Sequence, residues 1–416
     1  MKRSARLLGA LAAALLLSTP GARARGDTWP QFRGPNRNGQ SAETGLLKSW
    51  PAGGPKRLWL SKVDLGAGNS SMSVTDDAIY TTGVAGANGY VFRIDLNGKL
   101  VWKAKYAPEW KKNFLFSRTT PTVDGGRLYV MSGLGRIACL DAAKGTENWA
   151  IDTKRIYGSQ KITWGLAESP LICDDKVLCT PGGTKATIVA LDKVTGKEAW
   201  TARVGTDTSA YCSPIRIKDV RKDLIVTMLG ESVVGVRTAD GKLLWQTPYT
   251  GPWDVHANSP TYHDGRIYVT SGYDTGGLML ELAPDGGSVK RLWTDKTLDT
   301  HHGGVLLIGG HLYGANWISN AKGEWVCLDW RTGKVRFTEK WQNKGNLIAA
   351  DGMIYAYAES GAVGLIKPDP TGWKPVSEFR VKEGSGRHWA HMAIANGRLY
   401  LRHGGALMAY DIRAGK

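Results

Sequence analysis

The chain has 416 residues, of which 42% are hydrophobic, and its formal net charge at pH 7 is +17. This length suggests two or three domains unless the chain is built from repeats, and the apolar content suffices for a large core. The Lys and Arg residues are scattered, with no run of five, which disfavours a nucleic-acid-binding segment. We interpret the positive charge as a source of solubility and a preference for anionic ligands.

The first 24 residues are predicted to be a signal peptide. Lys2, Arg3 and Arg6 precede an apolar run from Leu7 to Leu17, and Ala22-Arg23-Ala24 is typical of a cleavage site. The apolar run is too short to span a bilayer, and no later stretch has the necessary length. A buried N-terminal helix is the alternative interpretation. With no cysteine placed for a lipid anchor, we expect a periplasmic or secreted protein cleaved after Ala24.

Five cysteines leave at least one without an internal partner. Cys173 and Cys179 flank a short hairpin and could meet across two strands, and the sequence leaves this disulfide open. Cys139 and Cys327 occupy matching repeat positions and are interpreted as small core residues. No pair has CxxC spacing, so zinc binding and thiol redox chemistry are disfavoured.

One unit recurs along the chain about every 45 residues. It contains short β-rich runs, a Leu-Asp sequence, a Gly-Lys turn and a closing aromatic residue, as in RIDLNGKLVW, ACLDAAKGTENW and VALDKVTGKEAW. Turns such as Asp-Gly and Asn-Gly favour tight hairpins between the runs. We expect the closing aromatic residues to pack between neighbouring sheets: Trp102, Trp149, Trp200, Trp245, Trp293, Phe337 and Phe379.

Repeats of this length with four strands each predict a β-propeller. Seven units are complete, and the C-terminal piece supplies three more strands. A matching fourth strand stands near the other end, from Lys56 to Leu60, with Trp59 in register. The sequence therefore predicts an all-β, eight-bladed propeller of four-stranded antiparallel blades, closed by the N-terminal strand. Residues 55–416 form this single domain, and residues 25–54 lead into it.

The segments from Val189 to Trp200 and from Val326 to Phe337 resemble the repeat of the pyrroloquinoline-quinone (PQQ)-type propeller family, including the tryptophan-docking motif of quinoprotein dehydrogenases. The sequence WPQFRGPNRNG resembles the start of many exported bacterial members. The resemblance extends from about Trp29 to Asp411. It implies either a PQQ- and calcium-dependent dehydrogenase or a quinone-free scaffold, such as the lipoprotein of the outer-membrane barrel-assembly machinery. The chain lacks the adjacent cysteines and CxxCH of many such enzymes and the lipidated cysteine of the scaffold.

Polar and aromatic residues gather in the loops that lead into the blades, which share one face of a propeller. These lead-in loops hold five of the eight histidines: His256, His301, His302, His388 and His391. Asn316 and Trp317 lie on a loop between second and third strands at the same face. We expect a ligand site at this channel face, where Trp164, Trp253, Trp317 and Trp389 could stack on a ligand. Arg118 and Arg387 could clamp a carboxylate or phosphate.

Carboxylates and amides of the same loops suggest further chemistry. Glu168, Asp254, Asn258 and Asp299 could supply oxygen ligands for calcium. His256, Glu168 or Asp254 could act as a general base, and the histidines could gather a transition metal. Alternatively, each of these residues only fills space and bonds loop carbonyls. Because His301 and His302 are adjacent, an extended backbone would point only one of them at the channel. No HxH, HExxH or GxSxG motif is present.

The sequence favours an exported propeller that binds a small molecule or an envelope protein through a His/Trp-rich channel face. The alternative is an oxidoreductase of the alcohol or polyol dehydrogenase type that uses PQQ and Ca²⁺ at the same face. No nucleic-acid partner and no transmembrane segment are expected. The substrate and the oligomeric state are not specified by the sequence.

Overall fold

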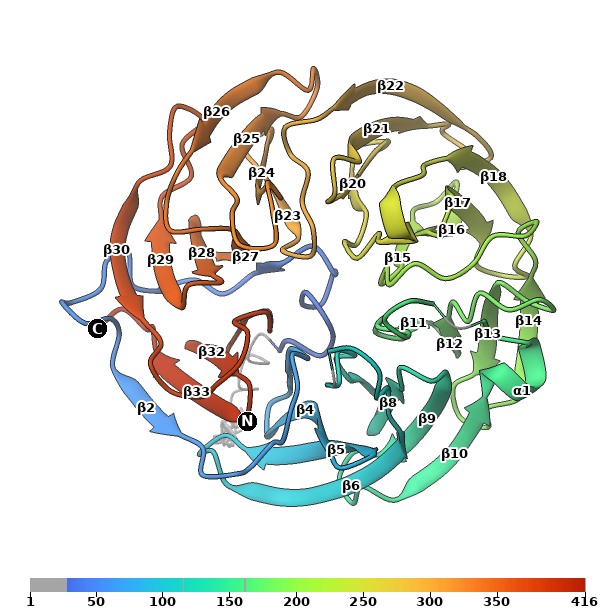
Figure 1. Ribbon diagram of the computed structural model, residues 1–416, viewed down its shortest axis with the longest axis horizontal. Coiled ribbons are helices and arrows are strands. Elements are labelled where there is room, and N and C mark those ends of the chain that lie inside the picture. Colours follow the sequence, from blue (N-terminus) through green and yellow to red (C-terminus); the bar gives the residue numbers. More distant parts are fainter. Residues whose placement is uncertain (1–27, 115, 161, 416) are drawn as a thin grey trace, which may run out of the picture.

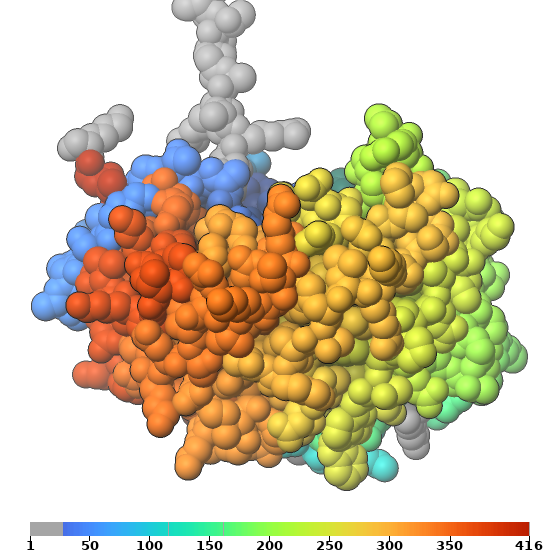
Figure 2. Space-filling view, turned by 90° about the horizontal axis from the view of Figure 1, so that it is seen from above, coloured from blue at the N-terminus to red at the C-terminus, as the bar shows by residue number. Residues whose placement is uncertain are grey.

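The computed structural model describes residues 28–415 apart from 115 and 161. Eight sheets are arranged as a ring around a central axis, which confirms the predicted eight-bladed all-β propeller (Figure 1). Seen from the side, successive blades pack against one another to form a thick disc (Figure 2). No helix among the described residues is long and apolar enough to cross a membrane. The predicted signal peptide, residues 1–24, lies outside the described residues.

The first four sheets follow one another along the chain. The first contains β3 (Ser73–Val74), β4 (Ala78–Ala85), β5 (Asn88–Asp95) and β6 (Leu100–Pro108). The second contains β7 (Thr122–Asp124), β8 (Arg127–Met131), β9 (Arg136–Asp141) and β10 (Glu147–Asp152). The third contains β11 (Leu171–Cys173), β12 (Lys176–Cys179), β13 (Ile188–Asp192) and β14 (Glu198–Ala202). The fourth contains β15 (Ile215–Lys218), β16 (Asp223–Met228), β17 (Ser232–Arg237) and β18 (Leu243–Pro248).

The next three sheets repeat the pattern. The fifth contains β19 (Thr261–His263), β20 (Arg266–Ser271), β21 (Gly276–Leu282) and β22 (Val289–Asp295). The sixth contains β23 (Val305–Ile308), β24 (His311–Ala315), β25 (Trp325–Asp329) and β26 (Val335–Glu339). The seventh contains β27 (Gly345–Ala350), β28 (Met353–Ala358), β29 (Ala362–Ile366) and β30 (Pro375–Arg380). The short helices α1 (Thr153–Tyr157) and η1 (Pro252–Asp254) lie in connections between blades.

The eighth sheet combines strands from both ends of the chain. Its strands β31 (Ala393–Ala395), β32 (Arg398–His403) and β33 (Ala406–Asp411) are joined by β2 (Arg57–Leu60). Strand β2 runs antiparallel to β33, with Trp59 opposite Ala409. Strand β1 (Gln40–Ser41) adds to the seventh sheet, parallel to β27. The eighth sheet thus has four strands although the C-terminal repeat supplies only three, and β1 gives the seventh sheet a fifth strand.

Each closing tryptophan joins its blade to the next one. The indole Nε1 donates to a turn carbonyl one repeat further on, as Trp102 does to Ala143 at 2.9 Å and Trp200 to Thr238 at 3.0 Å. The rings also cover the turn glycines of the next blade, such as Gly145, which has a φ of 74°. Only glycine adopts this conformation readily and leaves room for the ring. The apolar clusters between neighbouring sheets lie beside these contacts.

A second series of hydrogen bonds links the blades close to the central axis. The backbone N–H of Ser71 donates to Thr120 Oγ1 at 3.0 Å, that of Thr120 to Ser169 Oγ at 3.1 Å, and that of Ser169 to Ser213 Oγ at 3.0 Å. Each donor and acceptor are one repeat apart. The hydroxyl acceptors Thr120, Ser169 and Ser213, each followed by a proline, therefore bond adjacent blades together.

The segment 29–41 crosses the central channel before the first blade begins. Trp29 is fully buried and bridges to Val74 of the first sheet, while β1 reaches the seventh. Between them, the buried Arg37 donates to Ser169 O and Pro214 O, both at 3.0 Å, and to Pro170 O. Arg33 donates to Val305 O of the sixth sheet at 2.6 Å. We call residues 29–41 the channel segment.

All five cysteines are buried and free. Cys173 pairs with Lys176 across the β11–β12 hairpin, and Cys179 lies opposite Val189 on β13. The two sulfur atoms are therefore not joined, although the hairpin predicted for this region is present. Cys139 and Cys327 are buried in the cores between blades, in agreement with the sequence interpretation.

Candidate ligand-binding cavity

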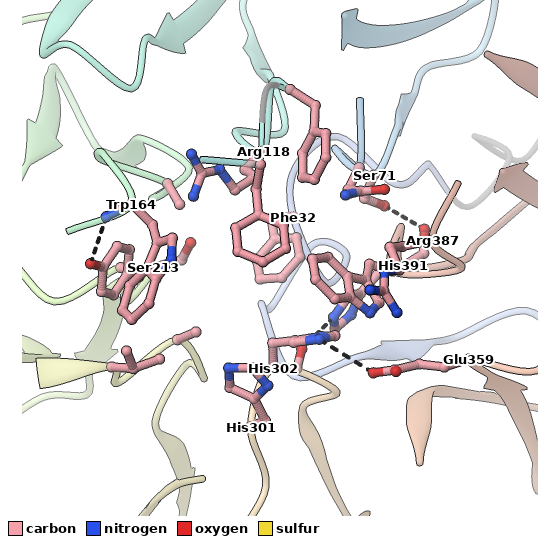
Figure 3. Close-up of a pocket in the computed structure, with 18 of the residues that line it drawn as sticks. Phe32, Ser71, Arg118, Trp164, Ser213, His301, His302, Glu359, Arg387 and His391 are labelled. Atoms are coloured by element: carbon pink, nitrogen blue, oxygen red, sulfur yellow. Dashed lines mark hydrogen bonds and ion pairs between the residues drawn. The ribbon is translucent and has the colours of Figure 1, made fainter. Parts of the chain in front are cut away.

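A cavity of about 300 Å³ lies at the channel, among the lead-in loops and several loops between second and third strands (Figure 3). Phe32 of the channel segment contributes to its wall and contacts His391, with ring centroids 4.9 Å apart. The aromatic part of the wall consists of Phe32, Phe114, Phe116, Trp164, Tyr211, Tyr273 and Trp389. The channel segment therefore bounds the cavity on its inner side.

The structure brings seven of the predicted site residues together. They line the cavity from lead-in loops of different blades: Arg118, Trp164, His301, His302, Arg387, Trp389 and His391. Figure 3 shows Arg118 and Trp164 across the cavity from His302 and His391. Arg387 lies over Trp389, with its Cζ 5.5 Å from the ring centroid.

The expectation that only one of His301 and His302 faces the channel is wrong. Both line the cavity, and their ring centroids are 4.7 Å apart. The backbone bends at residues 301–303, before β23 begins at Val305, so the alternation of an extended strand does not apply there.

Two predicted tryptophans lie beside rings of the cavity wall. Trp253 contacts Trp164 edge to face, with centroids 6.4 Å apart, and is 66% exposed. Trp317 contacts Tyr273, with centroids 4.6 Å apart. These pairs extend the aromatic surface from the cavity to its rim.

The aromatic rim includes an unusual backbone feature. Phe114, Tyr211, Trp253 and Tyr273 have positive φ angles between 50° and 71°. Bulky side chains rarely adopt this conformation, and residues so strained cluster at functional sites. Their common position around one cavity supports its assignment as the functional site.

Glu168 and His256 lie outside the cavity wall. Glu168 is buried and accepts hydrogen bonds from the Thr180 backbone N–H, at 2.5 Å, and its hydroxyl. Burial raises the pKa of its carboxyl to about 7. His256 is fully buried, with Nδ1 3.0 Å from Ser271 Oγ and Nε2 3.1 Å from Gly230 O. Burial lowers the pKa of this imidazole to about 4. Both side chains therefore hold neighbouring loops in place through hydrogen bonds.

Three other predicted polar residues also bond to backbone groups. Asn258 donates to Thr270 O at 3.1 Å and accepts from the N–H of Gly304 at 3.0 Å. Asp299 accepts from the N–H groups of Asp274 and Gly276, at 2.8 and 2.6 Å, and burial raises its pKa to about 6. Asn316 accepts from the N–H of Glu324 at 2.7 Å.

The remaining two predicted residues are placed apart from the cavity wall. His388 stacks on His403 with centroids 3.6 Å apart, and its Nδ1 lies 2.5 Å from the hydroxyl of Tyr357. Asp254 is exposed in η1 with a φ of 53°. Partial desolvation of the carboxyl, together with the nearby Glu231 and Asp207, raises its pKa.

Several side chains of the cavity carry hydrogen-bond donors that have no partner among the residues that the structure describes. They are Arg118 Nη2, Asn69 Nδ2 and Trp389 Nε1. Glu359 is the one carboxylate of the cavity wall among the described residues, and it lies 2.9 Å from Lys344 Nζ. Buried donors without acceptors are costly, so this cavity is suited to a ligand that brings acceptors, such as an oxyanion.

The sequence interpretation did not single out Phe32, Asn69, Lys344 and Glu359. Lys344 stands on the lead-in loop of the seventh blade and Glu359 on its β28–β29 loop, the two loop classes that the repeat had assigned to this face. Their repeat positions were therefore an available signal. Phe32 lies in the channel segment and Asn69 lies just before β3, the first strand of the first blade. No repeat pattern covers these positions, so none indicates that they reach the cavity.

The described residues contain no group of three or more His, Cys, Asp or Glu side chains arranged to hold a metal ion. Calcium takes six to eight oxygen ligands, several of them carboxylates. Glu168 and Asp299 use their oxygens on backbone N–H groups, and Glu359 is paired with Lys344. The donor set present therefore does not fit a calcium ion in the cavity.

The eight blades, with aromatic residues docked on the next blade, define a PQQ-like β-propeller. The profile of the family described as outer membrane protein assembly factor BamB matches residues 87–339, more than half of the chain. The chain belongs to this family. BamB from Moraxella catarrhalis has 17% identity and a TM-score of 0.63, covering 86% of this chain and all of the BamB chain.

Dehydrogenases share the same fold. The quinohemoprotein alcohol dehydrogenase from Comamonas testosteroni has 14% identity and a TM-score of 0.66, covering 94% of this chain and 81% of that chain. Among curated proteins, a quinohemoprotein alcohol dehydrogenase of Pseudomonas putida is 30% identical over 154 residues, or 34% of this chain and 20% of its own length. An uncharacterized protein of Rickettsia prowazekii is 28% identical over 272 residues, or 63% and 59%. The matches thus span between a fifth and three fifths of these curated relatives.

Proposed function

We propose that this protein is an exported binding propeller that takes an anionic group of a small molecule or of an envelope protein into the channel-face cavity. The observation that carries the proposal is the set of unpaired donors on Arg118, Asn69 and Trp389. An oxyanion would satisfy these donors, while the aromatic wall would cover a flat apolar body. Export rests on the signal-peptide pattern of residues 1–24, and the family description supports a partner in the envelope.

Binding of naphthalene-1,5-disulfonate, a flat dianion, tests this proposal by isothermal titration calorimetry. Losing a charge-assisted hydrogen bond costs about 1.5–3 kcal/mol, so Arg118→Gln should weaken binding by about 10- to 150-fold. Arg237→Gln is the matched control, because Arg237 is exposed and pairs with Asp240 on the β17–β18 turn. Equal binding by the wild type and Arg118→Gln, or no binding by the wild type, contradicts the proposal.

A quinone-dependent oxidoreductase is the second candidate, favoured by the 30% identity to an alcohol dehydrogenase. Arg118, Asn69 and Trp164 would hold the acid groups and flat ring of PQQ, which supplies a two-electron acceptor when bound. The cavity does not offer the calcium site that accompanies this chemistry. Incubation with PQQ, with and without calcium, followed by desalting and a dye-linked alcohol oxidation assay tests this candidate. If the protein retains quinone absorbance after desalting and oxidises alcohol, the result supports the oxidoreductase. If it shows neither the absorbance nor the alcohol oxidation, the result supports the binding protein.

A further inference from the structure

One wall of the cavity carries three ionisable side chains from three different loops. His302 precedes β23, Lys344 precedes β27, and Glu359 lies between β28 and β29. His302 Nε2 lies 3.5 Å from Glu359 Oε1 (Figure 3), and Lys344 Nζ lies 2.9 Å from Glu359 Oε2. We call these residues the His302 cluster.

Lys344 neutralises the carboxylate of this cluster. Its side chain and that of Glu359 are only 6% and 7% exposed, and Lys344 also donates to Asn320 O at 2.7 Å. Lys344 is therefore anchored by two acceptors beside Glu359. Within the part of the chain that the structure describes, His302 Nε2 has no hydrogen-bond partner. The cluster thus contains one buried imidazole nitrogen without a hydrogen-bonded acceptor, on a side chain that lines the cavity.

Aromatic and basic side chains surround His302. His301 lies beside it, with ring centroids 4.7 Å apart, and the Trp389 ring lies 5.2 Å away with Arg387 over it. His391 donates its Nε2 to the carbonyl of His302 at 2.8 Å.

Further cations surround this group. Arg118 stands across the cavity, and Arg33 of the channel segment raises the positive potential at His391. Burial, opposed by Glu359 and reinforced by Lys344, lowers the pKa of His302. Without a ligand, His302 is therefore neutral at pH 7.

We propose that the cavity takes up one proton from solvent together with its anionic ligand, and that His302 receives this proton. The inference rests on the proposed function and adds to it a proton-coupled mode of binding. A protonated His302 needs a negative charge beside it, and Glu359 supplies this charge only in part because it is paired with Lys344. An anion in contact with Nε2 supplies the rest. The protonated imidazole then donates to the anion, and the bound state carries one more proton than the sum of the free protein and the free anion.

The pH dependence of affinity follows from this linkage. A ligand that raises the pKa of His302 binds more tightly as the pH falls through the pKa of the bound state and on toward the lower pKa of the free state. For an anion of constant charge, we expect the affinity to increase by up to about tenfold per pH unit between pH 8 and 6.

Calorimetry with naphthalene-1,5-disulfonate measures the proton directly, because both sulfonates stay ionised throughout this range. Titrations at pH 7 in two buffers with different ionisation enthalpies should give close to one proton taken up by the wild type. His302→Gln keeps an amide donor but cannot titrate, so it should bind the probe with uptake close to zero and a flat pH profile. His263→Gln is the matched control, since His263 is exposed on the β19–β20 hairpin.

The outcomes separate the two proposals. Binding by the wild type without proton uptake, or uptake that persists in His302→Gln, overturns this inference and leaves the proposed function standing. No binding by the wild type overturns the proposed function and this inference with it. Histidine ¹⁵N spectra give an independent readout: the His302 signal should report a neutral ring at pH 7 in the free protein and an imidazolium at saturation. Equal thermal midpoints for the wild type and His302→Gln establish that the variant is folded.

Discussion

The indole ring of Trp149 lies against Gly196 of the next blade, so closely that a Cβ at position 196 would come within 2.6 Å of the ring. Gly196 has a φ of 71° and lies in the connection between β13 and β14. The same relationship joins Trp102 to Gly145 and Trp200 to Gly241. Contacts between blades therefore depend on a glycine and an aromatic residue that stand one repeat apart.

Gly196→Ala should destabilise the protein in two ways, through the positive φ and through the clash with Trp149. We expect a loss of about 2–4 kcal/mol, measured by chemical denaturation. Gly125→Ala is the matched control, because Gly125 has a φ of 53° and no atom within 4 Å of a Cβ. Equal losses in the two variants would show that the tryptophan contact contributes nothing.

Arg37→Met should weaken the attachment of the channel segment. It removes the guanidinium from the carbonyls of Ser169, Pro170 and Pro214 and leaves these buried acceptors without a donor. We expect a loss of about 2–4 kcal/mol and a lower thermal midpoint. Arg237→Met, at the exposed end of β17, should change the midpoint little, and an unchanged midpoint in Arg37→Met would contradict the assigned role.

Acid should destabilise the protein through His256. Its native pKa is about 4, against an ordinary value of 6.5, so only the unfolded chain binds this proton between these values. Stability is unaffected by this group above about pH 6.5 and falls as the pH drops to 4. The loss amounts to about 3 kcal/mol at 1.36 kcal/mol for each pH unit. Chemical denaturation at pH values from 7.5 to 4.5 gives the free energy of unfolding at each pH. This free energy should decrease less with falling pH for His256→Gln than for the wild type, and an equal decrease in both would refute the prediction.

The cysteines should be inert in the native state. All five are buried, and burial raises the pKa of Cys173 to about 12 and that of Cys212 to about 11. Thiolate is the reactive form, so a disulfide-exchange dye at pH 8 should react with none of them before unfolding and with five in denaturant. Rapid reaction of the folded protein, or fewer than five thiols after unfolding without reductant, would contradict this arrangement.

The repeat pattern indicated the fold because its signals are local. A turn glycine, two alternating β-rich runs and an aromatic residue such as Trp200 occupy fixed positions in each unit, and these determine hairpins and packing between blades. The same pattern assigned Arg118, Trp164, His302 and Trp389 to one face, and the structure brings them to one cavity. It did not indicate the channel segment, which carries no repeat and is placed only by contacts with distant blades.

The sequence by itself therefore determined the eight blades and the face at which polar and aromatic loops gather. Only the tertiary structure decided which of those loop residues meet in the cavity and which brace the blades. Glu168 and Thr180 belong to one blade, whereas His302, Lys344 and Glu359 come from separate loops brought together by the curvature of the ring. Side-chain direction in a bent loop follows from neighbours that lie one repeat or more away, and strand alternation does not describe it.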